Sequence, residues 1–212
     1  GPANAPIVKS SNAFHDSEGN MWVSSFNGGI TIFNQQTGTV KALNKTNGLA
    51  KDSVSAMMQT RQGKIWIAFK GGEMDALDIK AGTITHYTAA QGLPRGNTPV
   101  IVEDDHSQLW IGGDNGVRIL DPANKRLKWI TNESGLADNW VTSFVQDNNH
   151  RMWTGTISGG NVIDQYGETS LPLGSGQVIS LTEDVTGNIW VATTKGILLI
   201  NAQRSQVRRL DR

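Results

Sequence analysis

Histidine is the residue of this chain best suited to acid–base or metal chemistry, because its ring nitrogens titrate near neutral pH and bind transition metals. The chain has four: His15, His86, His106 and His150. In the repeat described below, three of them fall in or near turns between a first and a second strand, and His86 falls in an outer strand. This placement predicts no converging acid, base or nucleophile, so we expect no catalytic residue, no metal site and no cofactor. Acidic turns such as Glu103-Asp104-Asp105 lack the regular ligand alternation of a calcium loop, and we expect them to be solvated.

A tryptophan beside polar side chains is the strongest candidate for ligand binding. Trp140 follows Asp138 and Asn139, at a position where the other repeats carry polar residues. An indole ring there could stack on the face of a sugar while the carboxylate and the amide bind its hydroxyl groups. In the alternative interpretation, the ring packs against the next repeat. We place Trp140 and its two neighbours first among the candidate binding residues.

Further candidates lie in the turns between second and third strands and in the connections between repeats, where the repeated sequence varies most. They are Phe26, Asn27, Phe69, Lys70, Asp114, Asn115, Arg95 and Lys195. For the two phenylalanines a second interpretation is open, because an aromatic residue that ends a strand usually caps the core.

Five tryptophans set the period of the chain. They are separated by 44, 44, 43 and 37 residues, and they are Trp22, Trp66, Trp110, Trp153 and Trp190. The sixth residue after each is glycine, and the second is Gly, Ala or Ser. A period of this size is typical of repeat architectures. We therefore assign the tryptophan to packing between repeats, the glycine to a turn that needs a positive φ or close backbone approach, and the small residue to a crowded face.

Turn residues divide each repeat into four short extended segments. In the second repeat these are 54–58, 65–69, 74–79 and 83–87. No segment has a helical period long enough to cover a sheet, so each four-stranded unit must bury its faces against its neighbours. The pattern predicts an all-β fold, a β-propeller of about five four-stranded blades.

The expected blades cover residues 5–46, 47–90, 91–133, 134–171 and 172–212, after a tag remnant or leader at 1–4. The first repeat begins at its own first strand and the last ends after its fourth, so we expect no exchanged strand that locks a ring. Two arrangements stay open: five blades that close directly, or part of a larger ring or array with an edge that needs a partner.

The order of these motifs resembles one known family. Each repeat runs from Gly-Leu through an apolar strand to Asp-x-x-Gly-x-x-Trp-Ile/Val, a glycine turn and a closing strand, with local departures. This order is similar to the two-component regulator propeller repeat. The motif's aspartate is matched by Asp16, Asp104, Asp147 and Asp184. Thr60 departs from it, and Ser107 and His150 replace the turn glycine.

The resemblance implies a role in signalling. Proteins with these repeats are typically periplasmic sensor halves of bacterial hybrid two-component receptors or of membrane diguanylate cyclases, and the better understood ones recognise oligosaccharides. It implies a periplasmic sensor, a homodimer in the full-length receptor and a kinase or cyclase domain elsewhere. Propellers of this family usually have seven blades, whereas this sequence has five repeats. A related propeller, the streptogramin lyase, uses histidine with a metal ion, and that constellation is not matched here.

The charge composition of the chain excludes some classes of binding partner. Lys plus Arg and Asp plus Glu both number 19, so the net charge is +0. This balance removes the electrostatic footprint of a general nucleic-acid or anionic-membrane binder. The longest purely apolar run, residues 197–200, is far too short to span a bilayer, so we expect no membrane insertion. The absence of cysteine excludes disulfides and thiolate zinc sites.

We therefore expect a non-catalytic, extracytoplasmic sensor domain that binds an oligosaccharide or another small neutral ligand on one propeller face. The alternative is a propeller scaffold for protein contact or receptor dimerisation. A propeller lyase is a third and disfavoured hypothesis.

Overall fold

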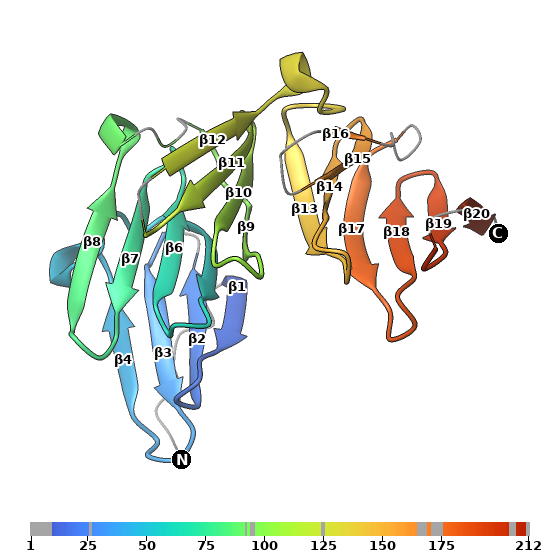
Figure 1. Cartoon of the computed structure of the whole chain (residues 1–212). Helices are drawn as coiled ribbons and strands as arrows, with labels where there is room; N and C mark the ends of the chain where they lie inside the picture. Colours follow the sequence, from blue (N-terminus) through green and yellow to red (C-terminus); the bar gives the residue numbers. More distant parts are fainter. Residues whose placement is uncertain are drawn as a thin grey trace. The chain divides into compact units, whose positions relative to one another are not determined.

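A computed structural model describes residues 10–25, 27–91, 93, 96–123, 126–164, 169–170, 176–203 and 207–210 of the chain. Five antiparallel sheets of four strands follow one another along the sequence, coloured from blue to red in Figure 1. In every sheet, strands that are consecutive in the chain are also hydrogen-bonded neighbours. The predicted all-β propeller fold is confirmed, and the strands of the second repeat lie within one residue of their predicted bounds.

The chain divides into two compact units. Gly1–Thr98 holds the first two sheets, with strands β1 (Ser10–His15), β2 (Asn20–Ser25), β3 (Ile30–Asn34), β4 (Val40–Leu43), β5 (Val54–Gln59), β6 (Ile65–Phe69), β7 (Met74–Asp78) and β8 (Thr83–Tyr87). Two 3-10 turns, η1 (Lys45–Asn47) and η2 (Ala89–Gln91), follow the outer strands β4 and β8.

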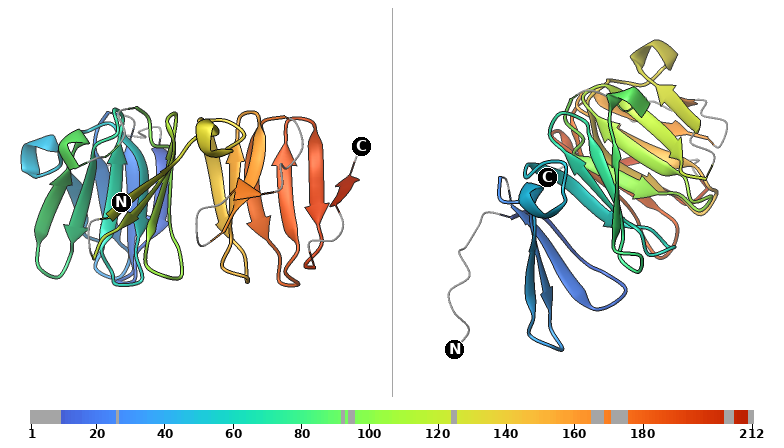
Figure 2. Two further views of the ribbon diagram at one scale, coloured as in Figure 1. Left: turned by 45° about the horizontal axis from the view of Figure 1, so that its top comes forward. Right: turned by 90° about the vertical axis from the view of Figure 1, so that its left-hand side faces the viewer.

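The second unit, Pro99–Arg212, holds the other three sheets. Its strands are β9 (Val100–Glu103), β10 (Leu109–Gly113), β11 (Gly116–Asp121), β12 (Arg126–Ile130), β13 (Val141–Gln146), β14 (Met152–Thr156), β15 (Gly159–Ile163), β16 (Thr169–Ser170), β17 (Val178–Glu183), β18 (Ile189–Thr193), β19 (Gly196–Ile200) and β20 (Val207–Leu210). The 3-10 turn η3 (Asn132–Ser134) precedes β13. Figure 2 shows η3, in yellow, at the end of its sheet where β13 begins, opposite the β13–β14 turn. Among the helices of the described residues, none is long and apolar enough to cross a membrane.

Burial follows the order of strands in each sheet. The second strands β6, β10 and β14 are buried along their whole length, whereas the fourth strands β4, β8 and β12 are mostly exposed. Within each unit the first strands pack side by side: β1 lies against β5, and β13 lies against both β9 and β17. Within each unit, neighbouring sheets therefore cover each other's apolar faces. This agrees with the prediction that sheets, and not helices, bury these faces.

Three of the repeat tryptophans pack between sheets, as predicted. Trp22 joins a core cluster with residues of β5 and β6, Trp110 one with residues of β13, and Trp153 one with residues of β17 and β18. Their relative exposures are only 2%, 4% and 1%. Trp190, in the last sheet, is partly exposed.

Each of four tryptophans also donates its indole N–H to the aspartate six residues earlier in the chain. The Nε1–Oδ2 distances are 2.7 Å for Trp22–Asp16 and 2.8 Å for the pairs Trp110–Asp104, Trp153–Asp147 and Trp190–Asp184. The second carboxylate oxygen accepts backbone N–H groups of the turn, such as those of Glu18 and Asn20 at Asp16. The family motif therefore joins the turn to the core, because a buried indole N–H needs an acceptor.

The turn glycine behaves as predicted in four sheets and differs in the first. Gly72, Gly116, Gly159 and Gly196 have positive φ values of 87°, 85°, 139° and 122°. In the first sheet the left-handed residue is Gly29 at 73°, one position later than the predicted Gly28. A Cβ atom at Gly29 would lie 2.4 Å from the carbonyl oxygen of Leu43, so only glycine fits there.

The small residue two positions after the tryptophan faces the first strand of the next sheet. At Gly155 a Cβ atom would lie 2.5 Å from Val178 Cγ1 and 2.5 Å from Ser143 Oγ. We expect Gly155→Val to lower the free energy of unfolding by about 1–3 kcal/mol, because the overpacked side chain forces β14 and β17 apart. Urea unfolding followed by circular dichroism measures the change. Ala192→Val, at the partly exposed equivalent position of the last sheet, is the control with a smaller expected effect; equal effects of the two substitutions would contradict inter-sheet crowding.

Candidate functional site

The connection from β12 to β13 is held in one conformation by its own side chains. Asn139 Oδ1 accepts the N–H of Asn132 at 2.8 Å, and Asn139 Nδ2 donates to Asn132 Oδ1 at 3.0 Å. From β15, Asn161 Oδ1 accepts the N–H of Ala137 at 2.7 Å. These bonds fix the backbone that carries residues 138–140.

The first unit repeats this arrangement. Asp52 Oδ1 accepts the N–H of Lys45 at 2.7 Å, and Asp75 Oδ2 of β7 accepts the N–H of Ala50 at 2.8 Å. Asn139 therefore corresponds to Asp52, and both side chains shape the connection between two sheets. The sequence hypothesis that the Asn139 amide faces a ligand is revised, because its oxygen and its nitrogen both bond within the loop.

Two turns are bonded to the same connection in the second unit. The N–H of Gly116, which follows the β10–β11 turn, donates to the carbonyl of Asn139 at 2.6 Å. The N–H of Ile157, in the β14–β15 turn, donates to the carbonyl of Trp140 at 3.1 Å. The structure thus brings Asp114 and Asn115, at the β10–β11 turn, to the segment that carries Trp140.

The Trp140 side chain lies on the surface, with 47% of its area exposed. Beside it, Asp138 Oδ1 accepts the N–H of Trp140 at 2.8 Å, and Asp138 Oδ2 accepts the hydroxyl of Ser158 at 2.7 Å. A carboxylate has about four lone-pair sites, so Asp138 can accept further bonds while these hold it in place. We call Asp114, Asn115, Asp138, Trp140 and Ser158 the Trp140 surface.

Trp140 occupies a position of the repeat that is polar in other sheets. Its carbonyl accepts from the turn after the second strand, and the carbonyls of Ser53 and Gln177 do the same, from Lys70 at 2.9 Å and from Thr194 at 3.0 Å. Ser53, Trp140 and Gln177, which the sequence aligned as equivalent positions of three repeats, are therefore equivalent in the structure as well. An exposed indole at this point distinguishes the fourth sheet from the sheets of Ser53 and Gln177.

The candidates of the first unit separate into surface and core. Asn27 and Lys70 are exposed, and the Lys70 carbonyl accepts from Lys51 Nζ at 3.2 Å. Phe69 is 0% exposed and packs in the core cluster with Trp22. The prediction that Phe69 is available to a surface ligand is therefore wrong, because the end of β6 is covered on both faces.

The other candidates are placed as follows. Lys195 is exposed in the β18–β19 turn, where its carbonyl accepts from Arg209 Nη2 at 2.6 Å. Asp114 is partly buried and its Oδ1 accepts from Asn115 Nδ2 at 2.9 Å. Phe26 and Arg95 lie outside the described residues.

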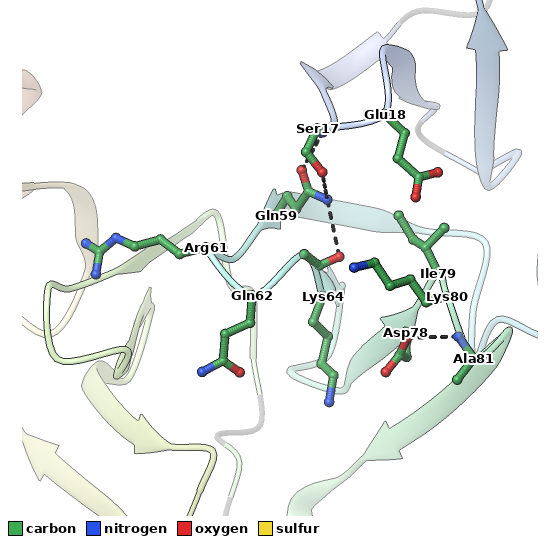
Figure 3. A pocket seen from close by; sticks show the side chains of 11 residues that line it. Ser17, Glu18, Gln59, Arg61, Gln62, Lys64, Asp78, Ile79, Lys80 and Ala81 are labelled. Atoms are coloured by element: carbon green, nitrogen blue, oxygen red, sulfur yellow. Dashed lines mark hydrogen bonds between the residues drawn. The ribbon is translucent and has the colours of Figure 1, made fainter.

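A hollow of about 540 Å³ in the first unit was not predicted from the sequence. It lies at the ends of β1, β5 and β7 and is lined by side chains of both charges, among them Glu18, Lys64, Asp78 and Lys80 (Figure 3). Gln59 spans its edge, where its Oε1 accepts the N–H of Ser17 at 2.7 Å. The mixed charges and the absence of an aromatic ring from its lining favour the Trp140 surface as the ligand site.

Two histidines meet in the second unit, contrary to expectation. His106 and His150 come from the β9–β10 and β13–β14 turns, and both direct Nδ1 at the carboxylate of Asp105. The sequence analysis did not predict this contact, because the two histidines belong to different repeats. The contact could have been predicted from the propeller fold, in which equivalent turns of adjacent blades lie side by side.

Comparison with known proteins finds a family match in two segments of the chain. Residues 135–158 and 172–195 match the model of the two component regulator propeller, and the first of these segments includes Trp140. No curated protein sequence matches the chain.

Several solved structures share the fold. The extracellular domain of BT3049 from B. thetaiotaomicron, described as a hybrid two component system, superposes with a TM-score of 0.82 at 20% identity, covering 100% of this chain and 30% of its own. The extracellular domain of BT4673 from the same organism gives a TM-score of 0.77 at 19% identity, covering 95% and 29%. The Cps50 (Swd1) β-propeller domain from Myceliophteria thermophila gives 0.71 at 15% identity, covering 97% and 72%.

The chain thus spans less than a third of the two bacterial extracellular domains. Identities of 15–20% establish the fold, while the family match is confined to the two matched segments, each of which contains an Asp–Trp hydrogen bond. Residues 135–158 and 172–195 are therefore repeats of the two-component regulator propeller type, within a chain that has a β-propeller fold.

Proposed function

We propose that this chain is a non-catalytic ligand-binding sensor domain from the extracytoplasmic part of a bacterial signal-transduction receptor, and that the Trp140 surface binds an oligosaccharide. The observation that carries the proposal is the half-exposed indole of Trp140 beside an anchored carboxylate. The family of the matched repeats and the extracellular domains that share the fold support a sensor on the outer side of a membrane.

The chemistry of the surface suits a neutral sugar. A pyranose presents a flat C–H face that packs on an aromatic ring and a rim of hydroxyl groups that donate and accept hydrogen bonds. Asp138 and Asp114 accept from hydroxyl groups, and Ser158 and Asn115 can both donate and accept. The balanced charge of the chain gives no long-range attraction to a strongly charged ligand.

Trp140→Ala is expected to abolish the rise in melting temperature that a bound neutral oligosaccharide causes by mass action, and to weaken the affinity about tenfold or more. A glycan library screened by thermal shift, with hits titrated calorimetrically, measures both. Phe33→Ala is the control, because Phe33 is an aromatic residue that is 38% exposed and lies on β3 in the first unit. A complete screen without any shift, or a Trp140→Ala variant that binds as the parent does, would refute the proposal.

A scaffold for protein contact is the second candidate function. The observation that favours it is an apolar group on the last sheet, where Ile179 and Ile197 are 58% and 43% exposed and Trp190 is partly exposed. Sedimentation velocity over a range of concentrations separates the two functions. Self-association that Ile197→Ser removes, in a chain that binds no glycan, would favour the scaffold.

A further inference from the structure

The β9–β10 and β13–β14 turns place two histidines and an aspartate together at the opposite end of their sheets from the Trp140 surface. His106 Nδ1 lies 2.9 Å from Asp105 Oδ1, and His150 Nδ1 contacts Asp105 Oδ2. The two imidazole rings have centroids 6.1 Å apart and cross at 68°. Since Asp105 and His106 belong to the third sheet and His150 to the fourth, the cluster spans two adjacent blades.

Asp105 is held in position by the neighbouring sheet. Gln146, the last residue of β13, donates from Nε2 to Asp105 Oδ1 at 2.6 Å and accepts the N–H of Asp105 at 2.9 Å. This orients the carboxylate so that its second oxygen faces His150. Support of this kind around a ligand carboxylate is typical of metal sites.

The cluster is open to solvent. The side-chain exposures are 59% for His106, 61% for His150 and 31% for Asp105. Ligand atoms of Asp104, Asp105 and His106 lie within 4.8 Å of one another. His150 is outside this group and contacts it through Asp105 Oδ2. Asp104 is committed elsewhere, because its carboxylate accepts from Trp110, His106 and Gln108, so the available donors are two imidazoles and one carboxylate.

The turn at His150 keeps the backbone conformation of the repeat but not its glycine. His150 has a φ of 63°, in a turn position that is glycine in three other sheets, with φ values of 80°, 85° and 83° at Gly19, Gly63 and Gly187. Histidine tolerates this region better than most residues, yet a left-handed non-glycine residue is uncommon. Ser107, the equivalent residue of the third sheet, has a φ of 62°, so both turns that form the cluster hold a left-handed residue other than glycine. Local strain of this kind concentrates at functional positions.

We propose that His106, His150 and Asp105 bind a divalent transition-metal ion of the Zn²⁺ class, with water completing the coordination. Tetrahedral zinc with bonds of about 2.0–2.2 Å separates its ligand atoms by about 3.3–3.6 Å. The distance of 2.9 Å between His106 Nδ1 and Asp105 Oδ1 is shorter than this, and rotation of the two exposed imidazoles brings their nitrogens to the ion. Two nitrogen donors disfavour Ca²⁺, which takes oxygen ligands.

The ion would join the third and fourth blades and stabilise the native state, since the unfolded chain does not hold the two turns together. The Asp105 position is serine, arginine, asparagine and valine in the other turns, at Ser17, Arg61, Asn148 and Val185. The site therefore belongs to one junction of this chain and not to the repeat. It revises the expectation of no metal site and is independent of the sugar-binding proposal.

Calorimetric titration of the chelator-treated 212-residue chain with Zn²⁺ alone tests the site. We expect saturable binding of one ion and a rise in melting temperature by mass action. His106→Ala, His150→Ala and Asp105→Asn should each weaken binding at least about tenfold, and Gln146→Ala about 10- to 100-fold through loss of carboxylate support. His15→Ala, an exposed histidine in the first unit, is the matched control that should bind as the parent does.

Co²⁺ provides a second readout, because ligation by imidazole nitrogens gives it visible absorption bands that the His106→Ala/His150→Ala double variant should lack. Binding of Ca²⁺ in place of Zn²⁺ would overturn the assignment. So would the absence of saturable Zn²⁺ binding, or an affinity that the double variant retains. These variants carry surface substitutions, and circular dichroism establishes that each one is folded.

Discussion

Trp153→Ala is expected to lower the free energy of unfolding of the second unit by about 3–5 kcal/mol, the range found when a large buried aromatic residue is truncated. Trp153 is 1% exposed and packs with Val178, Leu181, Ile189 and Val191 of the next sheet. Truncation leaves a cavity between the fourth and fifth sheets, and it also removes the indole donor from Asp147. The two losses act on the same inter-sheet contact.

Urea unfolding followed by far-ultraviolet circular dichroism measures this effect without relying on tryptophan fluorescence. Trp140→Ala is the control, because its ring is 47% exposed and its truncation should change stability by about 0.5 kcal/mol or less. A similar loss in the two variants would mean that the repeat tryptophan does not hold the sheets together. A variant too unstable to purify can be compared as Trp153→Phe, which keeps most of the apolar contact and lacks the N–H.

The repeat tryptophans show how far sequence reasoning reached into the fold. Their period predicted the blades, their burial and the small residues that face the next sheet, since all of these follow from side-chain size and alternation along a strand. The indole–carboxylate bond was not deduced, although both residues belong to the motif. Strand alternation tells which face a side chain occupies but not that a turn folds back to bring Asp147 to Trp153.

The candidate site also has features that the sequence predicted and features that it did not. The sequence singled out Trp140 because an aromatic residue replaces the polar residue of the other repeats at this position. The structure confirms that Ser53 and Gln177 occupy the equivalent positions. Asn139 and Phe69 were assigned to ligand contact because their positions vary, but variation does not reveal burial or a bond within the loop. The contacts between turns of adjacent blades, including the one that joins His106 and His150 through Asp105, depend on how sheets stack and could not be derived from spacing within one repeat.

Asp147→Ala is expected to lower the free energy of unfolding by about 3 kcal/mol, because it leaves buried donors without their acceptor. Asp147 is 4% exposed. Its Oδ2 accepts from Trp153 Nε1 at 2.8 Å and from Arg151 Nε at 3.0 Å, and its Oδ1 accepts the N–H groups of Asn149 and Arg151 at 2.9 and 3.1 Å. The same urea titration measures the loss, and Asp147→Asn, which can preserve part of the acceptor geometry, should lose less.

The pH dependence of the stability lost in Asp147→Ala shows how much of that loss comes from the charge of the carboxylate. Burial acts to raise the pKa of Asp147, but the hydrogen bonds from Trp153, Arg151 and Asn149 outweigh it and hold the pKa below its ordinary value. A carboxyl whose pKa is lowered by folding stabilises the native state above its unfolded pKa of about 3.9, and that contribution disappears as the pH falls towards the lower folded value. The difference in stability between the parent and Asp147→Ala should therefore be constant from pH 7 to about 5 and shrink below about pH 4. A difference that stays unchanged to pH 2.5 would show that the ionised carboxylate contributes nothing and that only packing is lost.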